Sequence, residues 1–166
     1  MNLMNRIYND KDFMKSASSI LTHKEFIKTK SIVHHGCTRY GHSLRVAYLS
    51  YRISKLLGFD TECVIRAGAL HDFFLVRDDE TILTNAKMFI KHPTMAKENA
   101  ITYFGINEKE QNIIESHMFP ASNVAPKSKE AWVVTLSDKL VALFEGASTV
   151  KAQLSMWMLF VVNFIK

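Results

Sequence analysis

The sequence has few of the residues that break helices or form covalent cross-links. Its 166 residues include two cysteines, three prolines and six glycines. Cys37 and Cys63 make no CxxC pair. With no disulfide framework, we expect a reducing compartment, the cytoplasm. The glycines and prolines lie mostly between helical patterns rather than inside strand-like segments, so the composition predicts an all-α fold.

The sequence also lacks an apolar run long enough to span a membrane. The strongly apolar segment from Leu154 to Ile165 is shorter than the roughly 20 residues that a transmembrane helix needs. We expect no transmembrane segment. Residues 148–166 are predicted to form an apolar C-terminal helix that docks on the rest of the fold. A homodimer contact or a membrane surface is the alternative for this helix.

Basic residues exceed acidic ones, but they form no block. Lysines and arginines number 21 against 16 acids, which gives a formal charge of +5. This balance favours phosphate-bearing or other anionic partners. The chain has no arginine-rich block and no alternation of aromatic and basic residues, so we expect no nucleic-acid partner.

The length and the 48% hydrophobic content predict a single domain, a helical bundle over residues 1–166. Apolar residues recur at helical spacing between capping signals. In the first half of the chain we expect one or two N-terminal scaffold helices within 12–30 that begin at Asp12, a helix from 39 to 57 that stops at Gly58, and a helix from Asp60 or Thr61. A helical piece from 81 to 91 should follow, and then a new helix that starts at His92-Pro93 and stops at Gly105. The last three expected helices are one capped by Asn107 and Glu110, one from Ser128 to Gly146, and one from Ser148.

Several of these helices carry a histidine or an acid on the face that should be buried. The adjacent pair His71-Asp72 lies in an apolar helical run. Taken alone, it is most simply a surface histidine beside a helix-terminal aspartate. However, His42 continues a stripe through Val46, Leu49, Ile53 and Leu56, and Asp138 continues another stripe. His92 and His117 lie where two further helices begin or end.

Buried carboxylates need a compensating charge. Asp72 and Asp138 would both be costly to bury alone, whereas a metal ion held by carboxylates and imidazoles satisfies them. This donor set suits a divalent transition metal, namely iron, manganese, cobalt, nickel or zinc. A hydrogen-bonded core histidine is the alternative for any one of the imidazoles.

The order of these residues, with the phrases RYGHSLRVA at 39–47, ALHD at 69–72 and SDK at 137–139, resembles the HD-domain superfamily of metal-dependent phosphohydrolases. The resemblance covers about residues 34–145. It implies that a first metal is held by His42, His71, Asp72 and Asp138, and that in members with two metals Asp72 bridges while His92 and His117 hold the second. It further implies catalytic roles for Asp72 and His71, with a metal-activated water attacking phosphorus in a phosphate ester or anhydride.

Basic residues near the motifs are candidates for neutralising phosphate oxygens. They are Lys139, Arg39, Arg45 and Lys91, together with His35, which precedes the first predicted ligand. For each of them a solvated surface position is the alternative.

The residues after the His-Asp pair depart from the common HD-Ile-Gly-Lys form, because Phe73, Phe74 and Leu75 stand there. Residues 104–110 resemble a phrase in the small HD proteins that split diadenosine tetraphosphate. We therefore expect a phosphorylated small molecule, a nucleotide or dinucleoside polyphosphate, as substrate. The alternative is a regulatory HD module that binds metal and a nucleotide-like ligand without turnover.

Overall fold

A computed structural model describes residues 3–34, 37–75 and 85–164, except for the side chains of 33–34, 85–90 and 148–164. Within these ranges the chain forms helices joined by loops and one pair of two-residue strands, so the all-α prediction is confirmed. The elements are α1 (Leu3–Asn9), α2 (Lys11–Leu21), α3 (Lys24–Ile27), a 3-10 turn (Lys28–Ser31), β1 (Val33–His34), β2 (Cys37–Thr38), α4 (Arg39–Leu57), α5 (Thr61–Leu70), α6 (Asn85–Phe104), α7 (Glu108–Ser116) and α8 (Lys129–Phe164).

Polar side chains begin most of these helices as the sequence predicts. The side chain of Asp60 accepts a hydrogen bond from the backbone of Cys63 at the start of α5. Asn107 and Glu110 form a reciprocal capping box on α7. These side chains satisfy backbone N–H groups that have no partner inside the helix, and so they set where each helix begins. At the N-terminus the cap of α2 is Asp10 instead of the expected Asp12.

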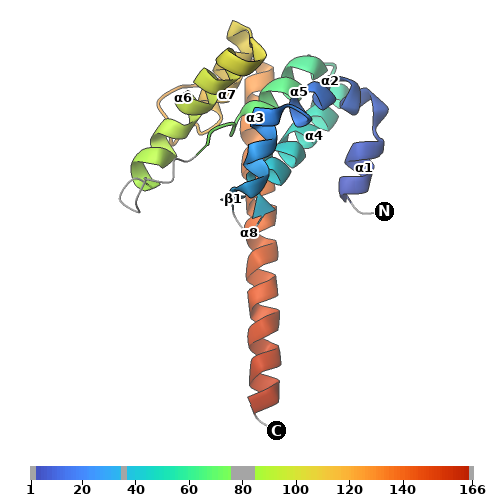
Figure 1. The fold of residues 1–166 in the computed structure, drawn as a ribbon, viewed down its shortest axis with the longest axis vertical. Coiled ribbons are helices and arrows are strands. Elements are labelled where there is room, and N and C mark those ends of the chain that lie inside the picture. Colours follow the sequence, from blue (N-terminus) through green and yellow to red (C-terminus); the bar gives the residue numbers. More distant parts are fainter. Residues whose placement is uncertain (1–2, 35–36, 76–84, 165–166) are drawn as a thin grey trace.

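Helix α4 lies at the centre of the fold and packs against α5 and α8 (Figure 1). Helix α5 packs tightly on α4 at Gly68, where an added Cβ would lie 3.0 Å from the Cα of Ala47. The predicted stripe of α4 is wrong at its far end, because Leu56 is 85% exposed. There the helix packs instead through Tyr48 and Tyr51, whose rings contact Phe13 of α2.

Helix α6 runs without a break from Asn85 to Phe104, so the predicted new start at His92-Pro93 is wrong. The first four residues of the expected 81–91 piece lie outside the described residues. A proline inside a helix removes one hydrogen bond, to the carbonyl four residues earlier. Burial of Ala96 and Ala100 in the core holds the helix together across Pro93.

Helix α8 also continues where the sequence predicts a break, because Gly146 lies inside it. A glycine costs a helix interior only about 1 kcal/mol, and good helix formers flank this one. At 36 residues, α8 is about 54 Å long, so its C-terminal part projects away from the other helices (Figure 1). The described backbone of residues 148–164 does not dock on the other helices as expected, residues 165–166 lie outside the described residues, and the homodimer stays a prediction.

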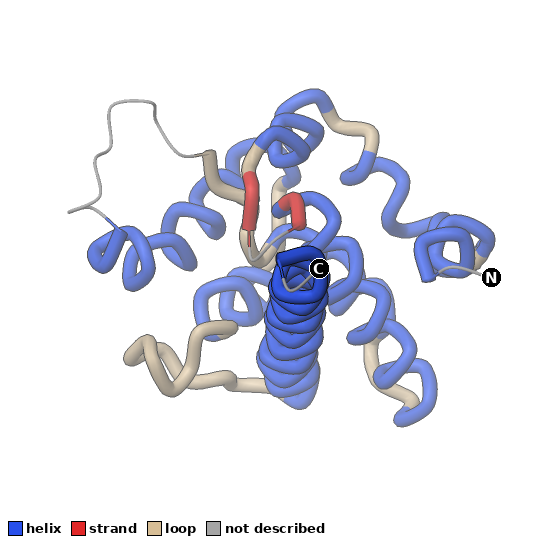
Figure 2. Tube along the Cα trace, turned by 90° about the horizontal axis from the view of Figure 1, so that it is seen from below, coloured by secondary structure: helices blue, strands red, loops and turns tan. Residues whose placement is uncertain are grey.

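Viewed from the C-terminal end of α8, the other helices surround its N-terminal part, with the two short strands beside it (Figure 2). None of the described helices is both long enough and apolar enough to cross a membrane.

Candidate metal centre

The helices bring the predicted metal ligands together in the core. His42 lies in the first turn of α4, His71 and Asp72 directly follow α5, His92 lies inside α6, His117 directly follows α7, and Asp138 lies in α8. The five residues other than Asp138 are at most 8% exposed, and the side chain of Asp138 is 13% exposed. Imidazoles and carboxylates that are so deeply buried need compensating charges or hydrogen bonds inside the protein.

Four of these residues form one side of the cluster. Nε2 of His42 lies 3.0 Å from Oδ1 of Asp138. Nε2 of His71 lies 3.5 Å from the same oxygen. It also lies 4.0 Å from Oδ2 of Asp72. Ligand atoms of His42, His71 and Asp72 all lie within 4.8 Å of one another, close enough to contact one metal ion.

The other oxygen of Asp72 faces a second group. Oδ1 of Asp72 lies 3.4 Å from Nε2 of His92 and 3.8 Å from Nε2 of His117. The two Nε2 atoms are 3.0 Å apart. Asp72, His92 and His117 therefore make a second group that could hold an ion, and Asp72 belongs to both groups.

Backbone carbonyls fix the orientation of two of the histidines. Nδ1 of His71 donates to the carbonyl of Gly68 at 2.8 Å, and Nδ1 of His117 donates to the carbonyl of Ile114 at 2.7 Å. With the proton on Nδ1, the lone pair of Nε2 faces the cluster, as in a metal-binding histidine. Nε2 of His71 is buried and forms no hydrogen bond with any described residue. A cation would satisfy this nitrogen, so the residues fit a divalent metal.

The comparison with protein families agrees with this geometry. The family model named HD domain matches residues 39–143, well over half of the chain. The chain belongs to the HD domain family. This confirms the predicted superfamily of metal-dependent phosphohydrolases, whose members bind divalent metals. Comparison with curated proteins and with solved structures gives no match.

Neighbouring charges and burial shift several pKa values in the HD site. Burial alone would lower the pKa of His42, but hydrogen bonds with Asp138 and Glu145 raise it to about 9. Burial would raise the pKa of Asp138, but contacts with His42 and His71 hold it well below its usual range. Burial and the neighbouring His71 lower the pKa of His117 to about 3. In the metal-free site these shifts favour a positively charged His42 beside a negatively charged Asp138.

Glu145 is part of this HD site, although its sequence context did not predict it. Its Oε2 accepts a hydrogen bond from Nδ1 of His42 at 2.8 Å, and its Oε1 accepts one from Nε of Arg45 at 2.7 Å. The signal was present in the spacing: Glu145 follows Asp138 by two helical turns and so shares its face of α8.

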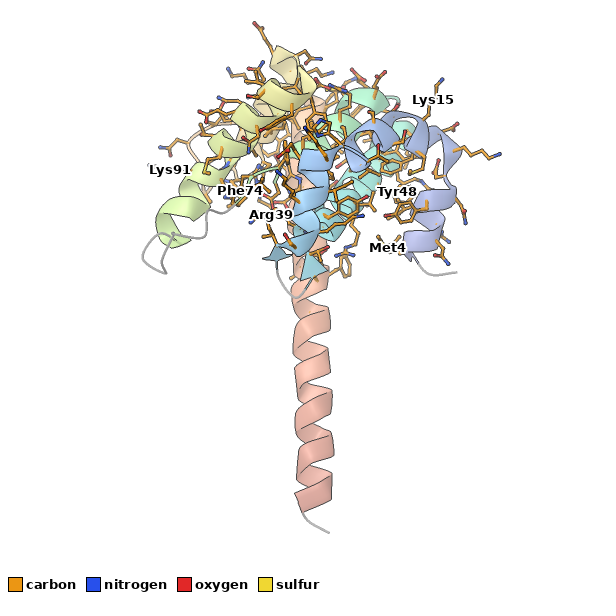
Figure 3. The ribbon with its side chains drawn as sticks, in the orientation of Figure 1. Met4, Lys15, Arg39, Tyr48, Phe74 and Lys91 are labelled. Carbon is orange, nitrogen blue, oxygen red and sulfur yellow. The ribbon has the colours of Figure 1, made fainter. Side chains whose placement is uncertain are left out.

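The predicted phosphate-binding residues differ in how they are placed. Arg39 is 5% exposed and donates from Nη1 to the carbonyl of Phe74 at 2.7 Å, while its buried Nε has no hydrogen-bond partner among the described residues. Arg45 is paired with Glu145. Lys139 donates to the carbonyl of His117 at 3.0 Å. Lys91 is exposed, at the edge of the fold (Figure 3), and His35 lies outside the described residues.

Proposed function

We propose that the protein is an active metal-dependent phosphohydrolase that cleaves a phosphate ester or anhydride, with a nucleotide or dinucleoside polyphosphate as substrate. The observation that carries the proposal is the position of Asp72, whose two carboxylate oxygens face two separate groups of imidazoles. Two ions held about one carboxylate form an arrangement suited to phosphoryl transfer.

In this proposal, His42, His71, Asp72 and Asp138 hold the first ion, and Asp72, His92 and His117 hold the second. Imidazole and carboxylate ligands suit iron, manganese, cobalt, nickel or zinc. A bound ion of this kind supplies Lewis acidity, which lowers the pKa of water and polarises a phosphoryl oxygen.

The protein's own residues orient the ligands and exclude solvent. His71 and His117 each present Nε2 because a backbone carbonyl holds Nδ1. Asp72, at 4% exposure, is shielded from bulk water, so its charge acts strongly on whatever lies between the two groups. Asp72 and His71 are therefore our candidates for the catalytic residues.

Arg39 is the best placed of the candidates for binding a phosphate oxygen. Its guanidinium is held in place by the carbonyl of Phe74, and its Nε still has a donor to offer within the described part of the chain. Arg45 already neutralises Glu145, and Lys139 already has a backbone partner. We assign Arg45 and Lys139 secondary roles in phosphate binding, together with His35.

One observation favours a second function, a regulatory HD module that binds metal and a nucleotide-like ligand without turnover. Phe74 places a buried aromatic ring against His92, where the common HD form has glycine. A ring at this position narrows the space beside the second group of ligands. Screening nucleotides with iron, manganese, cobalt and nickel separates the two functions, because a module of this kind would bind tightly and release no phosphate.

Replacing Asp72 tests the proposal. The Asp72→Ala protein should bind fewer metal ions than the wild type, measured by elemental analysis, and should lose phosphatase activity, because both ligand groups lose a shared carboxylate. Asp12→Ala is the control, since this acid is 75% exposed and pairs with Lys55 at the surface. Unchanged metal content and unchanged activity in the Asp72→Ala protein would contradict the proposal.

A further inference from the structure

The ring of Phe74 contacts both a cation and a predicted metal ligand. The guanidinium carbon of Arg39 lies 3.6 Å from the centroid of the Phe74 ring, and the two side chains lie together between α6 and α3 in Figure 3. The imidazole of His92 stacks on the same ring, with centroids 5.3 Å apart and an angle of 28° between the planes. Phe74 is 6% exposed, so this stack is almost entirely shielded from water.

The backbone around Phe74 is held in place from two sides. Its carbonyl accepts from Nη1 of Arg39 at 2.7 Å, and its N–H donates to the carbonyl of Asp72 at 2.8 Å. The carbonyl of Phe73 accepts from the side-chain amide of Asn99 at 3.0 Å. The turn that presents Asp72 is therefore bonded to the start of α4 and to α6.

Asn99 also fixes α6 relative to this turn. It follows His92 by seven residues, so the two positions share one face of α6. The Phe74 ring packs on that face at His92, while the Asn99 amide binds the backbone beside the ring. Together the two contacts fix the position of α6 relative to the turn and the plane of the His92 ring.

The first group of ligands is oriented by other residues. Glu145 holds Nδ1 of His42, and the carbonyl of Gly68 holds Nδ1 of His71. The first contact comes from α8 and the second from α5, and neither comes from the turn at Phe74. A change of the side chain at position 74 keeps the backbone hydrogen bond from Phe74 to Asp72, so His42 and His71 should keep their orientation while His92 loses its stacked neighbour.

We infer that Phe74 is a positioning residue, which sets the ring plane of His92 and thereby the affinity of the second metal site. The inference rests on the proposed function, because it assumes that His92 is a ligand. A stacked aromatic neighbour restrains an imidazole in a way that an aliphatic side chain of similar size does not. Residues that orient metal-binding histidines typically change metal affinity by 10- to 100-fold when they are replaced.

A calorimetric titration of the metal-free protein with Mn²⁺ tests this inference. The wild type should bind two ions. In Phe74→Leu the second ion should bind about tenfold more weakly, while the first keeps its affinity. Phe74→Tyr, which retains the ring, should restore the second site. Phe13→Leu is the matched control, because Phe13 is a buried ring that packs on Tyr48 and Tyr51, away from the ligands.

The outcomes separate this inference from the proposed function. If the wild type binds no Mn²⁺, the proposed function fails. If the wild type binds two ions and Phe74→Leu binds both with wild-type affinity, or weakens both equally, only the role of Phe74 is overturned. A wild type that binds one ion also overturns that role. Should Phe74→Leu fail to fold, as judged by circular dichroism, Phe74→Met carries the same expectation.

Discussion

Replacing Glu145 with glutamine tests whether the residue that only the structure revealed belongs to the metal site. The Glu145 carboxylate contacts His42 at 2.8 Å and Arg45 at 2.7 Å. Glutamine keeps the size and one acceptor oxygen but removes the charge. A carboxylate makes a histidine a stronger metal ligand than a neutral partner does.

Removing the negative charge beside His42 should weaken the binding of the first metal ion. We expect the first ion to bind 10- to 100-fold more weakly, which corresponds to about 1.4 to 2.8 kcal/mol. The second ion should be less affected, because His92 and His117 face the other oxygen of the Asp72 carboxylate. For the metal-free protein, the free energy of unfolding should fall by roughly 1 to 2 kcal/mol, because the amide oxygen retains part of the hydrogen bonding.

The assay is a competition titration with a chromogenic chelator, together with urea unfolding of the metal-free protein. Glu115→Gln serves as control, because Glu115 forms an equally short 2.7 Å pair with Lys97, but near the surface and without a histidine. The control should bind metal like the wild type and lose less than about 1 kcal/mol of stability. If Glu145→Gln bound the first ion with wild-type affinity, Glu145 would not belong to the metal site.

Two further predictions concern the metal-free protein. Because the pKa of His42 is raised from 6.5 to about 9, its contribution to stability is fully present below pH 6.5 and is lost as the pH rises through 9. The free energy of unfolding in urea should therefore be lower at pH 9.5 than at pH 6.5, by at most roughly 3 kcal/mol, and an equal or higher value would contradict this. Gly68→Ala should lower the free energy of unfolding by about 1 to 3 kcal/mol, because its new Cβ would press on Ala47. Gly146→Ala, which meets no atom within 4 Å, should instead raise it by about 0.5 to 1 kcal/mol, and the same sign for both variants would count against the packing argument.

The helices and the ligand types could be predicted because they depend on local sequence. Gly58 and Gly105 end α4 and α6 with positive φ angles of 68° and 56°, which glycine adopts easily. His42 and Asp138 stand out as polar residues at apolar positions of a helical repeat. Such signals need only the neighbouring residues along the chain.

The errors occurred where a local helix-ending signal was too weak to end the helix. Pro93 and Gly146 both suggest helix ends, yet α6 and α8 continue through them. Each residue weakens a helix by about 1 to 3 kcal/mol. At Pro93, burial of Ala96 and Ala100 outweighs this cost, and that burial depends on elements that are distant in the sequence. At Gly146, where Leu143 and Phe144 are exposed, the flanking helix formers alone outweigh the smaller cost of glycine.

Residue type and helical spacing are local properties, so the residues that could bind a metal can be identified from the sequence alone. How these residues meet depends on the packing of the helices: Asp72 faces two groups, Glu145 binds His42 from 103 positions away, and Phe74 stacks on His92. Distances of a few ångströms between separate helices depend on how those helices pack, and side-chain packing across the whole core sets that arrangement.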